Sequence, residues 1–309
     1  MTSLFTAPES AFLVPFDGSF CVEDTTTTPP EADRRHPKKR LRAAVRQLDR
    51  LQRLLLANET WSVLLIFQGM DASGKDGTIR AALSGVSPTG CQVSSFKRPT
   101  RRELARDFLW RTTKSLPERG RIAVFNRSQY EEVLAVRVHP EILANQRLPR
   151  VADCQTLWGE RLDSIRDQER HLARNGVVVL KFWLNVSMDE QKNRFLSRLD
   201  EPAKNWKFNP DDVAERRYWQ QYMHAYEDAL NATSRPSAPW YAIPADNKPY
   251  MRAAVAEIIV ASLSRLGLEY PQPDAGDLAG FELARENLQE DGDPRQNPAR
   301  TAGERSLSG

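Results

Sequence analysis

Residues that could bind phosphate lie close together after an apolar stretch near position 65. Gly69, Gly74 and Lys75 have the spacing Gly-x-x-x-x-Gly-Lys, directly after the apolar run 63–67 and before a helix-compatible segment. In such a loop the glycines let backbone N–H groups curl around phosphate oxygens, and the helix N-terminus and the lysine add positive charge. The pattern therefore predicts a phosphate-binding loop.

The loop departs from the general motif at one position. Asp76 stands where Ser or Thr usually helps to hold Mg²⁺, and Asp71 adds a further carboxylate inside the loop. The positions expected to surround the phosphates are Gly69, Ala72, Ser73, Gly74, Asp76, Gly77 and Thr78. The alternative is a glycine-rich turn without a ligand, which the combined spacing and flanking elements disfavour.

A second polar group, NRSQYEE, begins where another predicted strand ends at Phe125. Ligands of open parallel sheets bind outside the carboxyl ends of the strands, so this group is expected at a site. Asp71, Glu131 and Glu132 would supply the oxygen ligands that Mg²⁺ prefers. Alternatively, Arg127 forms a structural ion pair, and the two glutamates belong to a solvated helix start.

Two more basic groups suit phosphates. FKRP, residues 96–99, ends a further strand candidate, and Arg194 and Arg198 are spaced to share one helix face, with Lys204 and Lys207 beyond them. Phosphoryl transfer needs cations around the transferred group, a metal ion and in-line positioning. A solvated charged surface is the alternative for the second group.

The elements that must position these residues alternate along the chain. Strands are expected near 63–67, 91–96, 121–125 and 177–184, a short strand and turn over 238–247, and helices near 31–58, 76–83, 101–113, 153–175, 189–199, 211–230 and 251–266. This alternation predicts an α/β fold whose mostly parallel sheet carries helices on both faces. The stripe Trp219, Tyr222 and Tyr226 is interpreted as core packing rather than as a base-stacking platform.

Composition excludes several classes. The chain has 309 residues, 40% hydrophobic content, 28% charged content and a net charge of +3, so it is no polycation and we expect no nucleic-acid partner. Its three cysteines have neither metal-site nor disulfide spacing. We expect no membrane span and no secretory signal, and thus a cytoplasmic protein. Residues 1–30 are expected to form an arm, and residues 271–309 a disordered tail.

Taken together, the motifs resemble a family-2 polyphosphate kinase. They appear in the family's order over residues 31–266 and read GMDASGKDGT, SSFKRPTRRELARDFLWR, VFNRSQYEEVLAVRVHPE, KFWLNVSMDEQKNRFLSRLDEPAKNWKF and APWYAIPADNKPY. The resemblance implies a three-layer P-loop domain over 31–270, thymidylate-kinase-like, with a helical lid at 188–215. It also implies reversible transfer from inorganic polyphosphate to adenine or guanine nucleotides, with Mg²⁺ (or Mn²⁺), by a homodimer or homotetramer.

The resemblance also implies roles for individual residues. Asp71 would hold Mg²⁺ and orient the acceptor phosphate, beside the loop lysine Lys75, and Arg127 would stabilise charge on the transferred group. Asp76 is usual at its position in the family. The second motif often reads DRSWYN; Asn126 here matches subgroups that accept AMP or both AMP and ADP, and Glu131 or Glu132 would then share the metal. The nucleotide side would comprise Lys97, Arg98, Asn126, Glu131 and Arg137, and the polyphosphate side Arg194, Arg198, Lys204 and Lys207.

Two other functions fit parts of the pattern. An ATP-dependent nucleotide kinase would not need so long a cationic lid, and a non-catalytic polyphosphate-binding protein would not need both Asp71 and Lys75. Arg137 could instead pair with Glu141 on a helix face. A phosphohistidine at His139 is disfavoured because nothing in the sequence aims a nucleophile or base at it, so we expect direct transfer.

Overall fold

A five-stranded parallel sheet forms the centre of the fold in the computed structural model, which describes residues 5–31, 35–146, 148–149 and 153–290. The strands are β1 Ser62–Gln68, β2 Cys91–Ser95, β3 Ile122–Asn126, β4 Val177–Asn185 and β5 Trp240–Pro244. Their spatial order is β2-β3-β1-β4-β5, and every neighbouring pair is parallel. The predicted α/β class is confirmed.

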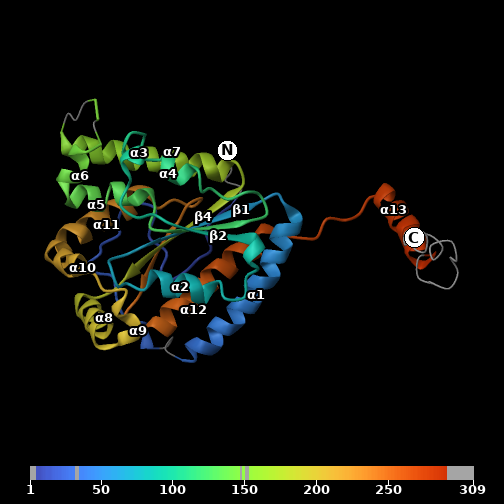
Figure 1. Ribbon diagram of the computed structural model, residues 1–309, viewed down its shortest axis with the longest axis horizontal. Coiled ribbons are helices and arrows are strands. Elements are labelled where there is room, and N and C mark those ends of the chain that lie inside the picture. The colour runs from blue at the N-terminus through green and yellow to red at the C-terminus, as the bar shows by residue number, and fades with distance from the viewer. Residues whose placement is uncertain (1–4, 32–34, 147, 150–152, 291–309) are drawn as a thin grey trace, which may run out of the picture. The chain divides into compact units, whose positions relative to one another are not determined.

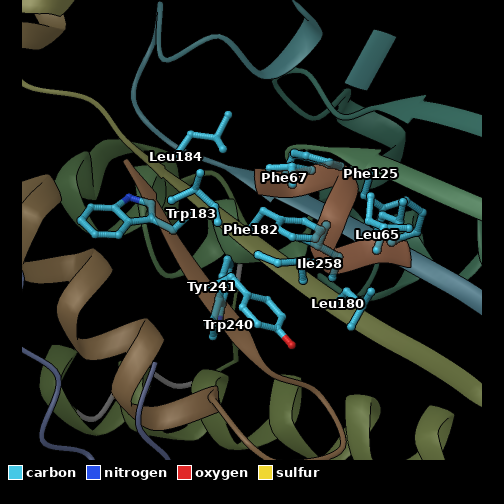
Figure 2. Packing of buried hydrophobic residues seen from close by; sticks show 14 of the residues in the cluster. Leu65, Phe67, Phe125, Leu180, Phe182, Trp183, Leu184, Trp240, Tyr241 and Ile258 are labelled. Carbon is cyan, nitrogen blue, oxygen red and sulfur yellow. The ribbon is translucent and has the colours of Figure 1, made fainter. Parts of the chain in front are cut away.

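The central strands are buried on both faces because helices cover the sheet. All seven residues of β1 are buried, as expected for a continuous apolar run in a parallel sheet. Phe67 pairs in register with Phe182, and their rings stack with centroids 5.1 Å apart. Tyr241 continues the stack at 5.8 Å from Phe182. Figure 2 shows this aromatic row running across neighbouring strands.

Long helices form the outer layers. Figure 1 shows α1, α2 and α12 on one side of the sheet and α7 on the other, and α11 packs against α7. The long helices of this group are α1 Pro37–Asn58, α7 Cys154–Arg174, α11 Trp219–Thr233 and α12 Lys248–Leu263, whereas α2, Lys75–Ala82, has 8 residues. The other helices of this part of the chain are α3 Arg101–Leu104, α4 Trp110–Thr113, α5 Ala135–Val138, α6 Pro140–Ala144, α8 Met188–Asp200, α9 Pro202–Asn205 and α10 Pro210–Ala214.

Two predicted helices are interrupted. Residues 101–113 form α3 and α4 rather than one helix, because the side chain of Asp107 accepts a hydrogen bond from the backbone N–H of Leu109 and starts a new turn. Residues 211–230 divide into α10, a 3₁₀ segment and α11. Glu215, in that 3₁₀ segment, lies 2.9 Å from Nε2 of His139, a tertiary contact that local sequence does not reveal.

The N-terminal arm covers the outer edge of the sheet. Leu13 forms an antiparallel bridge with Tyr241 of β5, and the backbone N–H of Val14 donates to the carbonyl of Trp240. Val14 is fully buried. The arm therefore protects an otherwise open strand edge.

Residues from Tyr270 onward form a second unit, because the internal contacts divide after Glu269. This unit contains α13, Ala275–Glu290, which lies within the range expected to form a disordered tail. Asp274 and Asp277 start the helix by exchanging backbone-to-carboxylate hydrogen bonds of 2.8 and 3.0 Å. Residues 291–309 lie outside the described residues. Within the described part of the chain, no helix combines the length and apolar character needed to cross a membrane.

Candidate active site

The predicted phosphate-binding loop is a tight turn between β1 and α2. Gly69 and Gly74 have φ angles of 149° and 104°, and Ala72 has a left-handed φ of 61°. A methyl group at Gly69 would lie 2.9 Å from the carbonyl oxygen of Leu184 and from Oγ of Ser73, so only glycine fits there. Oγ of Ser73 is buried and has no hydrogen-bond partner among the described residues.

Lys75 lies inside this turn. Its side chain is buried, and Nζ donates to the carbonyl oxygens of Gly69 and Met70 at 2.6 and 3.1 Å. Burial, followed by the positive charge of Arg127, lowers the pKa of Lys75 to about 8. An anion bound in the loop would offset both effects.

Arg127 connects the end of β3 to the loop. It has a left-handed φ of 63°, and its backbone N–H donates to the carbonyl of Phe67. Nη2 lies 2.5 Å from Oδ1 of Asp71, and Nη1 lies 3.8 Å from Oε2 of Glu131. Glu131 and then Asp71 raise the pKa of Arg127 against the opposing effect of burial. Two distant sequence motifs thus meet as one charged cluster, which includes the structural ion pair considered above.

Asn126 and the first turn of α2 form a second link between these motifs. Nδ2 of Asn126 donates to Oδ1 of Asp76 at 2.7 Å. Oγ1 of Thr78 donates to the carbonyl oxygen of Gly74 at 3.0 Å and so stabilises the start of α2. Asn126 therefore lies beside the loop, bound to the residue that replaces the usual Ser or Thr.

The structure separates the two adjacent glutamates of the predicted metal group. Glu131 faces Arg127, whereas Glu132 is buried and accepts hydrogen bonds from Arg161 (3.1 Å) and Gln146 (2.6 Å). Burial raises the pKa of Glu132. The sequence predicts that Glu132 joins Asp71 and Glu131 as a metal ligand; in the structure its carboxylate is engaged by Arg161 and Gln146. No group of three or more potential metal-binding side chains occurs within the described ranges.

Arg194 of α8 holds the loop from behind. Its guanidinium donates to the carbonyl oxygens of Ala72 (3.0 Å), Ser73 (2.7 Å) and Ala245 (2.5 Å), and Nε binds Glu190 at 2.7 Å. Arg194, for which the sequence predicts a direct phosphate contact, has 6% of its surface exposed and contacts the loop carbonyls instead of solvent. By binding loop carbonyls, it instead leaves the loop N–H groups for phosphate.

The other predicted lid cations have partners within the lid. Arg198 contacts Asp212 at 3.3 Å, and Lys204 contacts Glu201 at 2.5 Å. Nζ of Lys207 lies 4.9 Å from the ring centroid of Trp206. Carboxylates of the lid therefore neutralise Arg198 and Lys204, whereas Lys207 contacts an aromatic ring.

A cavity of about 580 Å³ adjoins the loop. From the predicted site it is lined by Gly69, Asp71, Lys97, Arg98, Arg127, Glu131 and Glu132. Arg137 is not among its lining residues; it pairs with Asp228 at 2.7 Å at a second cavity, rather than with Glu141. The structure therefore separates Arg137 from the predicted nucleotide side.

Aromatic residues that the sequence assigned to packing also line this cavity. Tyr222 and Tyr226 both contribute to its wall, with Tyr218 one turn before Tyr222. Tyr226 is nevertheless almost fully buried, so this residue both packs in the core and contributes to the cavity wall. The four-residue spacing of these tyrosines places them on one helix face, and this pattern could have indicated that they line a cavity. Arg111 and His139, which also line the cavity, gave no comparable signal.

A buried polar network fixes the segment after Arg127. Nζ of Lys181 lies 2.5 Å from Oε2 of Glu169, 3.0 Å from the hydroxyl of Tyr130 and 2.8 Å from the carbonyl of Thr233. Burial lowers the pKa of Lys181 and raises that of Glu169. The network joins β4, α7 and α11 to the NRSQYEE motif and so orients it.

Comparisons with known proteins agree with this geometry. Residues 31–269 match the model of the family described as Polyphosphate kinase 2 (PPK2). A curated "ADP-polyphosphate phosphotransferase" from Rhodopseudomonas palustris is 52% identical over 80% of this chain and 86% of its own. An "AMP/ADP-polyphosphate phosphotransferase" from Meiothermus ruber is 46% identical over 74% and 82%.

A solved structure shares the fold as well. The crystal structure of Polyphosphate Kinase 2 from Arthrobacter aurescens TC1 matches with a TM-score of 0.80 and 36% identity, over 91% of this chain and 98% of that chain. The family match covers the loop, the NRSQYEE motif and the lid. The chain belongs to the polyphosphate kinase 2 family.

Proposed function

We propose that this protein transfers the terminal phosphoryl group of inorganic polyphosphate to a nucleoside mono- or diphosphate, reversibly and with Mg²⁺. The names of the relatives from R. palustris and M. ruber support polyphosphate as donor and AMP or ADP as acceptor. The observation that carries the proposal is the 2.5 Å pair between Arg127 and Asp71, which joins the phosphate-binding loop to the cavity.

The donor would bind at the loop. The backbone N–H groups of the loop and the N-terminus of α2 would bind its terminal phosphates, with Lys75 releasing the carbonyls of Gly69 and Met70 to contact them. Arg194 would keep the loop carbonyls directed away from the phosphates.

The acceptor would bind in the adjoining cavity. Lys97, Arg98 and Arg111 supply positive charge there, and Tyr218 and Tyr222 supply ring faces for a base. The volume of about 580 Å³ lies in the range of small-molecule sites. The nucleotide phosphate would then point toward Asp71 and Arg127.

The charges at the junction suit a magnesium ion. Asp71 and Glu131 both contact Arg127, and Mg²⁺ is commonly held by one or two carboxylates together with substrate phosphates. These two residues would hold it, while Glu132 would not. When bound, Mg²⁺ would neutralise charge on the oxygens of donor and acceptor.

The chemistry needs no proton abstraction. An anionic oxygen of the acceptor phosphate forms a bond to the terminal phosphorus of polyphosphate, and the bond from that phosphorus to the next bridging oxygen breaks. The leaving group is polyphosphate shortened by one unit. Arg127 stabilises the charge on the transferred group, which is the main catalytic requirement of phosphoryl transfer.

One assay tests the proposal. The protein is supplied with polyphosphate, Mg²⁺ and AMP, ADP, GMP or GDP in turn, and nucleotide products are separated by chromatography. We expect ADP or ATP to form from the adenine acceptors. Phosphorylation with ATP alone as donor would favour an ordinary nucleotide kinase, and binding of polyphosphate without product would favour a non-catalytic protein. A homodimer or homotetramer stays a prediction, which light scattering can test.

A further inference from the structure

Three basic side chains lie together on α2 and α12, the helices adjoining the phosphate-binding loop. Arg80 belongs to the last turn of α2, and Lys248 and Arg252 begin α12. Lys248 and Arg252 are four positions apart and therefore share one helix face. The two helices pack against each other (Figure 1). We call Arg80, Lys248 and Arg252 the α2–α12 cationic strip.

Arg252 lies directly on the loop helix. A methyl group at Gly77 would come within 3.0 Å of Nη2 of Arg252, so the guanidinium covers the first turn of α2. Nε of Arg252 is buried and has no hydrogen-bond partner in the part of the chain that the structure describes. An unsatisfied buried donor in a native structure calls for an explanation such as an absent ion.

The members of the strip repel one another. Burial is the main cause that lowers the pKa of Arg252, and the charge of Arg80 adds to it. Burial likewise lowers the pKa of Lys248; the like charges of Arg194, Lys204 and Arg252 add to this effect, and Glu190 opposes it. Arg80, Arg252 and Lys248 therefore lie close enough for neighbouring charges in the series to interact.

Among the described residues, the strip differs from Arg198 and Lys204 of the lid in lacking direct ion pairs, although Glu190 acts on Lys248 from beyond ion-pair distance. Arg198 and Lys204 each contact a carboxylate, whereas within the described residues no carboxylate oxygen lies within 4.0 Å of a basic nitrogen of Arg80, Lys248 or Arg252. Gathering like charges without partners is unfavourable unless an anion binds. Positive charge without a direct ion pair therefore lies on α2 and α12 beside the loop, in addition to Lys207 of the lid and to Lys97 and Arg98 of the cavity.

The spacing of these charges favours a chain of phosphates over a single one. Lys248 and Arg252 are separated by about 6 Å along the helix axis, and Arg80 extends the series along α2. A single phosphate would contact only one or two residues of the α2–α12 cationic strip. A linear polyanion that carries a negative charge on every unit would contact all of them.

We propose that the α2–α12 cationic strip binds the trailing phosphates of a polyphosphate chain whose end occupies the phosphate-binding loop. This inference rests on the proposed function, because it takes polyphosphate as the donor. It predicts that long chains bind more tightly than chains too short to reach the strip, and that this advantage depends on Arg80 and Lys248.

Equilibrium binding without nucleotide tests the inference independently of turnover. Titration calorimetry of the full chain measures the Kd of long-chain polyphosphate and of tripolyphosphate for the wild type, Arg80→Gln and Lys248→Gln. Both changed residues are exposed, so the variants are expected to fold. We expect the Kd of the long chain, divided by the Kd of tripolyphosphate, to rise about fivefold in each variant. The salt dependence of long-chain binding should also become weaker.

A matched control removes a cation elsewhere. Arg174, exposed at the end of α7, has no ion-pair partner among the described residues, and Arg174→Gln should leave the Kd ratio at the wild-type value. Equal ratios in the strip variants and the wild type would overturn the inference. Failure of the proposed function would appear separately, as absence of product in the acceptor assay.

Discussion

At the scale of single residues, two glutamates that are adjacent in sequence have different roles. Glu131 and Glu132 are adjacent carboxylates in a 3₁₀ segment, Gln129–Glu132, and sequence reasoning gave both the same role. The structure turns Glu131 toward Arg127 and buries Glu132 against Arg161. Direction within a short irregular turn depends on tertiary partners, so spacing alone could not separate them.

These two glutamates provide a matched pair of variants. Glu131→Gln should lower kcat by about tenfold or more, because it removes charge beside Arg127, and should leave stability nearly unchanged. Glu132→Gln should lower the free energy of unfolding by about 2–4 kcal/mol, since it weakens a buried ion pair. Urea unfolding and the acceptor assay measure both effects. The reverse assignment, with Glu132→Gln folded normally and inactive, would contradict the separate roles proposed for the two glutamates.

Lys75 makes polyphosphate binding depend on pH. Its pKa in the free protein is about 8, below the ordinary value of 10.5, so the charged form is lost as pH rises through 8. Bound phosphate favours the charged form and raises this pKa, so binding above pH 8 must take up a proton. Tripolyphosphate affinity should therefore fall about tenfold between pH 7 and pH 9.

Calorimetry in two buffers of different ionisation enthalpy checks this. Proton uptake should approach one per complex at pH 9 and be close to zero at pH 6.5. Uptake that does not change between these pH values would show that Lys75 does not titrate with binding.

At the scale of elements, α8 acts on the loop rather than on the substrate. The four-residue spacing of Arg194 and Arg198 correctly indicated a shared helix, but only the packed structure shows that Arg194 is buried against loop carbonyls whereas Arg198 contacts Asp212. A helical pattern predicts which residues share a face, but not which part of that face is covered by a neighbouring loop.

This difference predicts that replacing Arg194 and replacing Arg198 by Gln lower the free energy of unfolding by unequal amounts. Arg194→Gln should lower the free energy of unfolding by about 3 kcal/mol, because several buried carbonyls lose a charged donor, and should also weaken tripolyphosphate binding. Arg198→Gln should cost about 1 kcal/mol or less. Chemical denaturation compares the two variants directly. Equal costs would mean that the bonds from Arg194 to the loop contribute little.

At the scale of the whole molecule, the parallel sheet and the loop could be predicted because both follow from local patterns, whereas the strand order β2-β3-β1-β4-β5 could not. Continuous apolar runs gave buried strands such as β1, and the glycine spacing gave the turn that precedes α2. Helix interruptions, the partners of Arg137 and the second role of the tyrosines depend on contacts between distant segments. The strip on α2 and α12 was missed for the same reason: its members come from two motifs that only folding brings together.

The division after Glu269 predicts that the remaining residues are dispensable for the domain. A chain that ends at Glu269 should keep the thermal midpoint of the full chain within experimental error, because the core residues all precede that position. Its rate in the acceptor assay should also be unchanged. Scanning calorimetry measures the midpoint. A marked fall in either quantity would show that residues 270–309 support the domain.

The central claim is that Asp71 and Arg127 act together on a phosphoryl group between the loop and the cavity. Asp71→Asn keeps the shape of the side chain but removes its charge toward Arg127 and toward a metal ion. Single-turnover transfer from polyphosphate to ADP should fall by about 10²–10³-fold, with the thermal midpoint close to that of the wild type. A correctly folded Asp71→Asn protein that transfers phosphate within a few-fold of the wild-type rate would contradict the account.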